Sequence, residues 1–208
     1  MIRSATHIAL VGLGPDRGLH KQYPADQVWG INAANLVFDR VDLLFNMHTY
    51  PAKFEQMEAD GRQEAIDNVT ASLDKALADG VPVLSCAPYA HYTNIVPYPI
   101  DNIVAALGID YFACSAAYAL AYAFWTGVKR IDIYGVTGKE NHEYQHPCLA
   151  YWIGRGHGHG VDIRSIGRGS NLLRTDPSPF APVTRQTRYG FDLHALGAEA
   201  FIEKVVGQ

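Results

Sequence analysis

The fold is decided by residues 115–135, which read SAAYALAYAFWTGVKRIDIYG. Residues 115–125 are apolar on nearly every side of a helix, which predicts a central, buried helix that ends at Gly127. Residues 130–135, RIDIYG, predict a short strand that closes on a glycine. A buried helix that leads into a strand is the building unit of α/β proteins, so this stretch predicts an α/β fold.

The same alternation continues on both sides of this stretch. Further strands are predicted at residues 7–14, 28–32, 41–47, 81–85 and 161–166. Further helices are predicted at residues 51–79, 100–108, 147–156 and 195–206. Because strand and helix alternate throughout, we expect an α/β sandwich with a mostly parallel central sheet.

The length of 208 residues predicts a single domain over residues 1–208. Residues 86–99 are rich in Pro, Tyr and His, and residues 136–146 are polar, so both are expected to be loops beside a cleft. Residues 167–194 are expected to form an irregular, lid-like segment.

Composition narrows the class of protein. A formal net charge of −4 argues against a general nucleic-acid binder, and 48% apolar residues exclude a disordered chain. No apolar run approaches the roughly 20 residues that span a bilayer. Cys86, Cys114 and Cys148 lie far apart and form no CxxC motif, which favours free thiols in a reducing cytoplasm.

Positive charge gathers late in the chain. Residues 155–188 contain six arginines and two aspartates, a local charge of +4. An anionic ligand near this segment and a solvated arginine-rich loop both fit this pattern, and the sequence leaves the two interpretations open.

Candidate ligand-binding residues follow from the predicted topology. Open α/β sheets bind ligands beyond the carboxyl ends of their strands, and the residues expected there are small and polar, which suits a nucleotide or a sugar. We predict a nucleotide site formed by Gly12, Gly14, Pro15, Asn32, Asn46, His48, Ser115, Thr137, Lys139 and Arg168.

Two features of this predicted site each allow a second interpretation. The turn at Gly12 and Gly14 is not GxGxxG, because Arg17 stands in place of the third glycine, and no GK[ST] sequence occurs. A tight turn without a ligand therefore stays open beside a phosphate-binding turn. Ser115 opens the apolar helix, where its hydroxyl is expected either to cap the helix or to hold a phosphate.

Catalytic candidates lie after the predicted strand at 130–135. His142 and His146 flank Glu143, and a histidine there could remove a proton from an acceptor hydroxyl. We predict His142, His146 and Glu143 as the catalytic group. No dedicated metal site is predicted, because the spacing is not HExxH.

These elements together resemble a known pattern. A first strand that ends in G-x-G-P at 12–15, a second that ends at Asn32, and residues 115–136 are similar to the Rossmann-like group that includes bacterial CMP-sialic-acid sialyltransferases and 6-hydroxymethylpterin diphosphokinase-like proteins. Uncharacterised proteins of bacteriophages and prophages also resemble it, with EYQHP at 143–147, the helix up to Gly160 and a late Tyr189-Gly190.

The resemblance implies a three-layer Rossmann-like sandwich. It also implies that Gly12, Gly14, Asn32 and Ser115 contact a nucleotide, and that a histidine or tyrosine after the strand at 130–135 serves the acceptor. The favoured function is a nucleotide-binding transferase, namely a glycosyltransferase whose donor is a nucleotide-activated sugar.

Two alternatives remain for the function. One is a diphosphokinase-like enzyme acting on a pterin or nucleoside, with Mg²⁺ held by Asp16, Glu140 and Glu143. The other is a non-catalytic phage protein that binds a nucleotide. In each case the expected partner is a small nucleotide ligand, no membrane span is expected, and a homo-oligomer is left open.

Overall fold

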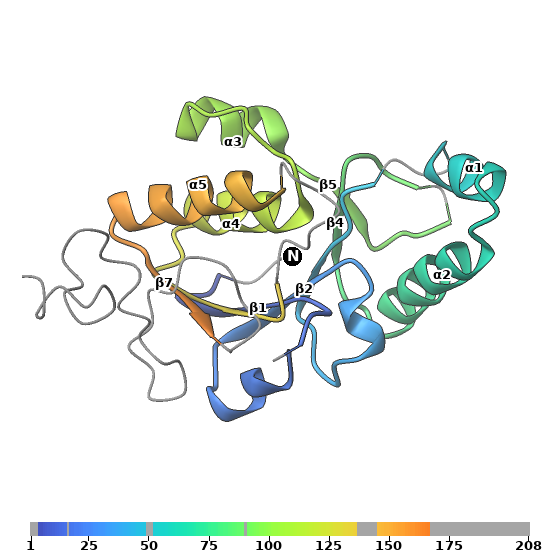
Figure 1. Cartoon of the computed structure of the whole chain (residues 1–208), viewed down its shortest axis with the longest axis horizontal. Helices are drawn as coiled ribbons and strands as arrows, with labels where there is room; N and C mark the ends of the chain where they lie inside the picture. Colours follow the sequence, from blue (N-terminus) through green and yellow to red (C-terminus); the bar gives the residue numbers. More distant parts are fainter. Residues whose placement is uncertain (1–3, 16, 49–51, 90, 137–144, 167–208) are drawn as a thin grey trace, which may run out of the picture. The chain divides into compact units, whose positions relative to one another are not determined.

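The structure is a computed structural model that describes residues 4–15, 17–48, 52–89, 91–136 and 145–166 (Figure 1). The chain divides into two units, Met1–Thr175 and Asp176–Gln208, and all described residues belong to the first. In chain order its elements are β1 (His7–Val11), the 3-10 helix η1 (Arg17–Gln22), β2 (Gln27–Ile31), the 3-10 helix η2 (Ala34–Leu36), β3 (Leu43–Phe45), α1 (Ala52–Ala59), α2 (Gln63–Ala78), β4 (Val83–Ser85), β5 (Ile95–Pro97), α3 (Ile100–Leu107), α4 (Ser115–Trp125), β6 (Arg130–Tyr134), α5 (Gln145–Gly158) and β7 (Asp162–Ile166).

The described strands form one seven-stranded sheet in the order β5-β4-β3-β2-β1-β6-β7. Every pair in it is parallel, and β1 lies between β2 and β6, with Ala9 opposite Val28 of β2 and Asp132 of β6. The predicted α/β fold with a mostly parallel sheet is therefore confirmed.

Helices cover both faces of this sheet, which makes three layers (Figure 1). On one face, α3, α4 and α5 enclose a core that includes Leu120 and Trp152 together with Ile8 and Ile133 of the central strands. On the other face, α2 and the two 3-10 helices enclose a second core that includes Leu73. Because both faces are buried, the strands are apolar almost throughout.

Residues 115–135 form the helix and the strand that their sequence predicted. Helix α4 runs from Ser115 to Trp125, and β6 follows at Arg130–Tyr134. Five alanines of α4 are buried, and their small side chains let the helix lie close to the sheet. Gly127 adopts a φ of 82°, the left-handed conformation that ends a helix and that glycine accepts most easily.

The predicted helix over residues 51–79 is wrong as a single element. The structure has two helices there, α1 and α2, and Gly61 lies between them with a φ of 67°. The Arg62 N–H donates to the Met57 carbonyl at 2.8 Å, which closes the end of α1. A glycine inside a helical pattern can either be tolerated or end the helix, and here it ends the helix.

A strand was also missed. Residues 86–99 were predicted as an irregular loop, but they contain β5, which pairs with β4 at the edge of the sheet. Pro97 hid this strand, because proline cannot donate a ladder hydrogen bond and occurs in sheets mainly on edge strands. Helix α5 is longer than the predicted 147–156, and η1 and η2 were not predicted.

Several predictions fall outside the described residues. They are the lid-like segment 167–194 and the helix at 195–206, and the single-domain organisation over 1–208 stays a prediction. Among the residues that the structure describes, no helix is both long and apolar enough to cross a membrane.

One charged group is buried between the central strands. Asp132 of β6 is 0% exposed, and its carboxylate lies 2.7 Å from Nε2 of His7 and 2.9 Å from a guanidinium nitrogen of Arg130. A buried carboxylate is tolerated only when such partners compensate for the water it has lost.

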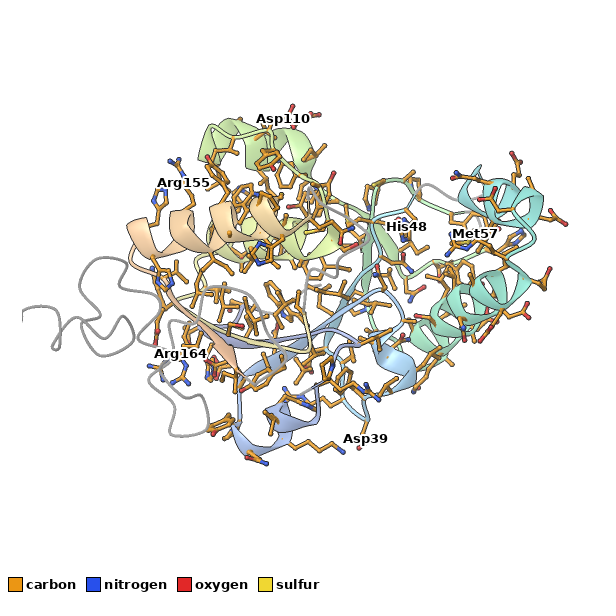
Figure 2. The ribbon with its side chains drawn as sticks, viewed as in Figure 1. Asp39, His48, Met57, Asp110, Arg155 and Arg164 are labelled. Carbon is orange, nitrogen blue, oxygen red and sulfur yellow. The ribbon has the colours of Figure 1, made fainter. Side chains whose placement is uncertain are left out.

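We predict that Asp132→Asn lowers the free energy of unfolding by about 1–3 kcal/mol, because the amide cannot replace both charged contacts. The measurement is urea unfolding followed by circular dichroism. The matched control is Asp39→Asn, whose partner is Lys21 and whose side chain is 89% exposed (Figure 2), so its loss should cost less than about 1 kcal/mol. Equal losses in the two variants would contradict this account.

Candidate functional site

The order of the strands places a switch point between β1 and β6. The chain leaves β1 through η1, which packs with Leu19 on the core that contains Leu73, and then enters β2. It leaves β6 and returns through α5, which packs on the opposite face, to β7. Two neighbouring strands whose connections diverge to opposite faces leave a crevice at their carboxyl ends, and α/β proteins bind ligands there.

A cavity of about 810 Å³ lies at this edge of the sheet. Its walls come from the carboxyl ends of β1, β2, β3 and β6 and from the start of α4. The residues of these segments that line it are Gly12, Leu13, Gly14, Ile31, Asn32, Met47, His48, Cys114, Ser115, Ala116, Gly135 and Val136. A volume of this size is within the range of small-molecule sites.

The glycines of the first turn are required by backbone packing. The N–H of Gly12 donates to the Tyr134 carbonyl at 2.8 Å, and the N–H of Gly14 donates to the Gly135 carbonyl at 2.7 Å. A Cβ on Gly12 would lie 2.6 Å from the Gly135 oxygen, and a Cβ on Gly135 would lie 2.8 Å from the Gly12 oxygen. These two amides are therefore occupied within the protein, although both glycines of the turn line the cavity.

Asn32 and Ser115 meet in the cavity wall. The Ser115 hydroxyl donates to Oδ1 of Asn32 at 3.2 Å across 83 positions of sequence. Asn32 is the one non-glycine residue in the described chain with a positive φ, 55°. Such backbone conformations gather at functional sites, where the surrounding structure holds them. The structure thus brings together two residues that the sequence singled out separately.

A buried polar pair holds the turn after Asn32. Asn35 of η2 donates from Nδ2 to the Ser72 carbonyl at 2.7 Å, and the Ser72 hydroxyl donates to Oδ1 of Asn35 at 2.5 Å. Both residues are buried, so each satisfies the other away from water. This pair ties the turn that carries Asn32 to α2.

The cap of α4 differs from the prediction by one residue. Cys114, with φ −158° and ψ 156°, occupies the N-cap position, and Ser115 is the first residue of the helix. The prediction that Ser115 caps the helix is therefore wrong, and its hydroxyl is directed to Asn32 instead. The first N–H groups of an α-helix have no partner within the helix and attract negative charge, and Ser115 and Ala116 both line the cavity.

The cysteines near the cavity are protonated at neutral pH. Burial raises the pKa of Cys114 to about 11, and burial also raises the pKa of Cys148. A thiol needs a lowered pKa to act as a nucleophile, so these side chains serve packing.

Sequence reasoning missed part of the cavity wall. Phe112 and Tyr118 line it, and their rings stack with centroids 4.5 Å apart, while Phe112 also stacks on Trp152. Burial raises the pKa of Tyr118, which keeps its hydroxyl a hydrogen-bond donor. Tyr118 follows Ser115 by three positions and shares its side of the helix, so that spacing could have identified it.

The other missed residues come from α1, α2 and α5. Met57 of α1, labelled in Figure 2, lines the cavity. His48 after β3, also labelled there, lines it as the sequence predicted. Arg62, between α1 and α2, and Gln145, at the start of α5, line it as well. None of the described lining residues is Asp or Glu, and Arg62 is the one Lys or Arg among them, so the described wall has a positive formal charge.

The remaining predicted site residues do not line the cavity or lie outside the described residues. Pro15 is exposed and Asn46 is buried, and neither lines the cavity. His146 is half-buried in the first turn of α5, next to Gln145. Thr137, Lys139, His142, Glu143 and Arg168 lie outside the described residues, as do Asp16 and Glu140.

The two loops predicted beside a cleft, 136–146 and 86–99, differ in whether their described residues line the cavity. Val136 and Gln145, at the two ends of the described part of the loop 136–146, line the cavity. The described residues of 86–99 do not line it. Within the described chain, no group of three or more His, Cys, Asp or Glu side chains is placed to hold a metal ion.

Comparisons with known proteins give a distant structural similarity and show no family. No family model matches the chain, and no curated protein matches its sequence significantly. Two solved structures of the sialyltransferase CstII from Campylobacter jejuni are similar to it, one in complex with cytidine-5'-monophosphate and one with CMP-3FNeuAc. Each has 13% sequence identity and a TM-score of 0.48, and the matches cover 81% and 80% of this chain and 81% of each CstII chain.

The chain is thus distantly similar in structure to a sialyltransferase. Beyond this structural similarity, the family resemblance drawn from the sequence stays a prediction. An origin in a bacteriophage or prophage stays a prediction.

The close backbone contact between the ends of β1 and β6 can be tested by a substitution at Gly135. Gly135 has a φ of 63° and no room for a Cβ, so we predict that Gly135→Ala lowers the free energy of unfolding by about 2–4 kcal/mol. The control is Gly18→Ala in η1, where nothing lies within 4 Å of an added Cβ and the change should stay within about 1 kcal/mol. Urea denaturation of both variants measures the difference, and native stability in Gly135→Ala would refute the packing role.

Proposed function

We propose that the protein is a nucleotide-binding transferase whose donor is a nucleotide-activated sugar. The observation that carries this proposal is the Ser115–Asn32 contact at the switch point, inside a cavity of about 810 Å³. A small-molecule site is expected at such a crevice, and the polar groups that converge there suit a ligand with phosphates and hydroxyls.

The start of α4 is the natural position for a phosphate. The Ser115 hydroxyl supplies a donor there, and the N-terminal end of the helix dipole adds positive potential. The amide nitrogen of Asn32 supplies a further donor to a sugar hydroxyl or a base. The absence of carboxylates from the described wall favours an anionic ligand, because no negative charge there opposes it.

For transfer, an acceptor hydroxyl must lose a proton as the sugar bond to phosphate breaks. His146 is the described member of the predicted catalytic group, and it lies next to Gln145 in the cavity wall. We propose that His146 or His142 takes that proton, with Glu143 beside them. The donors at the start of α4 would stabilise the departing phosphate.

The alternative phosphoryl-transfer chemistry depends on other residues. A Mg²⁺ ion would need Asp16, Glu140 and Glu143, since the described wall offers no carboxylate. A protein that only binds nucleotides is the second alternative. Mass spectrometry after incubation with UDP-glucose or CMP-activated sugars separates both from a glycosyltransferase, because only the transferase produces a free nucleotide and a glycosylated acceptor.

We expect that isothermal titration with CMP, UDP, GDP and ADP reveals one ligand that binds in the micromolar range. Ser115→Ala should weaken that ligand about 10- to 100-fold, the effect of losing a hydrogen bond to a charged group. Alanine is favourable in a helix, so the variant should stay folded. The control is Thr126→Ala at the other end of α4, whose hydroxyl donates to Tyr122. Absence of binding by all four nucleotides would overturn the proposal.

Asn32 offers a second variant at the same site. Glycine accepts the φ of 55°, so Asn32→Gly keeps the turn while it removes the amide that faces Ser115. We expect a stability within about 1 kcal/mol of the native protein and a nucleotide affinity at least tenfold lower. A folded Asn32→Gly protein with native affinity would show that Asn32 shapes the turn and does not contact the ligand.

A further inference from the structure

Arg62 is held at the cavity by its backbone. Its N–H donates to the Met57 carbonyl at 2.8 Å, and its own carbonyl accepts from Ala65 at 3.0 Å and from Ile66 at 3.2 Å. Gly61, with a φ of 67°, makes the sharp turn that leads into it. The break between α1 and α2 therefore fixes the backbone of Arg62 at the cavity wall, and the residue is exposed there.

The guanidinium of Arg62 differs from those of the other described arginines. Arg40, Arg130 and Arg164 form ion pairs with Asp42, Asp132 and Asp162, and Arg17 and Arg155 donate to backbone carbonyls. Of the six arginines that the structure describes, Arg62 alone has no hydrogen bond or ion pair from its side chain. It is also the one that lines the cavity.

Arg62 and Ser115 approach the cavity from opposite layers. Helix α4 packs on the face of the sheet that carries Ile8 and Ile133, whereas α2 packs on the other face through Leu73. Figure 1 shows these two helices on either side of the sheet. A ligand that reaches both residues must therefore cross the carboxyl edge of the strands.

We propose that Arg62 forms a second anion-binding position, which takes a phosphate or carboxylate of the ligand other than the phosphate held at the start of α4. A planar guanidinium binds either group through two parallel hydrogen bonds, and no described carboxylate of the wall competes for it. This inference rests on the proposed function and adds that the donor carries two anionic groups. They are either two phosphates or one phosphate and an acidic group on the transferred sugar.

The test compares ligands that differ by one anionic group. One arm titrates CMP against CDP, UMP against UDP, GMP against GDP and AMP against ADP. The other arm titrates UDP-glucose against UDP-glucuronate, and the carboxyl methyl ester of CMP-N-acetylneuraminate against CMP-N-acetylneuraminate itself. In at least one pair we expect the native protein to bind the ligand with the additional anion at least tenfold more tightly. The arm in which this occurs identifies the second group as phosphate or carboxylate.

Arg62→Ala should erase that preference and leave the affinity for the ligand with fewer anions within about twofold. Arg62 makes no side-chain cap at the start of α2, so its removal should leave the helix intact, which a thermal melt checks. Arg62→Lys should restore part of the preference, because lysine keeps the charge but not the paired donors. The control is Lys129→Ala, which removes the same charge from the exposed turn before β6.

The outcomes separate the two proposals. If the native protein binds no nucleotide, both the proposed function and the role of Arg62 are overturned. If nucleotides bind but no pair shows the preference, or if Arg62→Ala retains it, only the role of Arg62 is overturned. An equal loss of preference in Lys129→Ala would also overturn the role of Arg62, because the preference would then depend on the net charge of the protein and not on Arg62.

Discussion

The backbone contact between the ends of β1 and β6 is the constraint on which the rest of the structure depends. Gly12 and Gly135 approach so closely that neither tolerates a side chain. The Gly12 N–H donates to the Tyr134 carbonyl, and the Gly135 carbonyl accepts from the Gly14 N–H. This contact joins the two halves of the sheet. It also sets the floor of the cavity, because the connections after β1 and β6 diverge from this point to opposite faces.

The cavity follows from that divergence. Helix α4 brings its N-terminus to the carboxyl ends of the strands, and Ser115 there contacts the strained turn at Asn32. On the opposite layer, α2 is tied to the same turn through the buried Ser72–Asn35 pair. The wall is therefore built from both helical layers, with hydrogen-bond donors on one side and the unpaired Arg62 on the other.

The described wall of the cavity carries no negative charge. Its described members include no carboxylate, and the pKa values of Cys114 and Tyr118 are raised by burial, so neither adds a negative charge at neutral pH. Apolar side chains such as Leu13, Ile31, Met47 and Leu149 line the same cavity, so the wall combines an apolar surface with neutral and cationic polar groups.

The amino-acid sequence by itself determined the α/β class, most of the strands and the limits of α4. It also identified Asn32 and Ser115 as candidate site residues. These features depend on local patterns, such as apolar runs, glycines after helices and polar residues after strands. Only the tertiary structure decided that Gly61 divides α1 from α2, that β5 joins the sheet edge despite Pro97, and that Arg62 lines the cavity. These features depend on contacts between segments far apart in the chain, and no local pattern contains the partner that decides them.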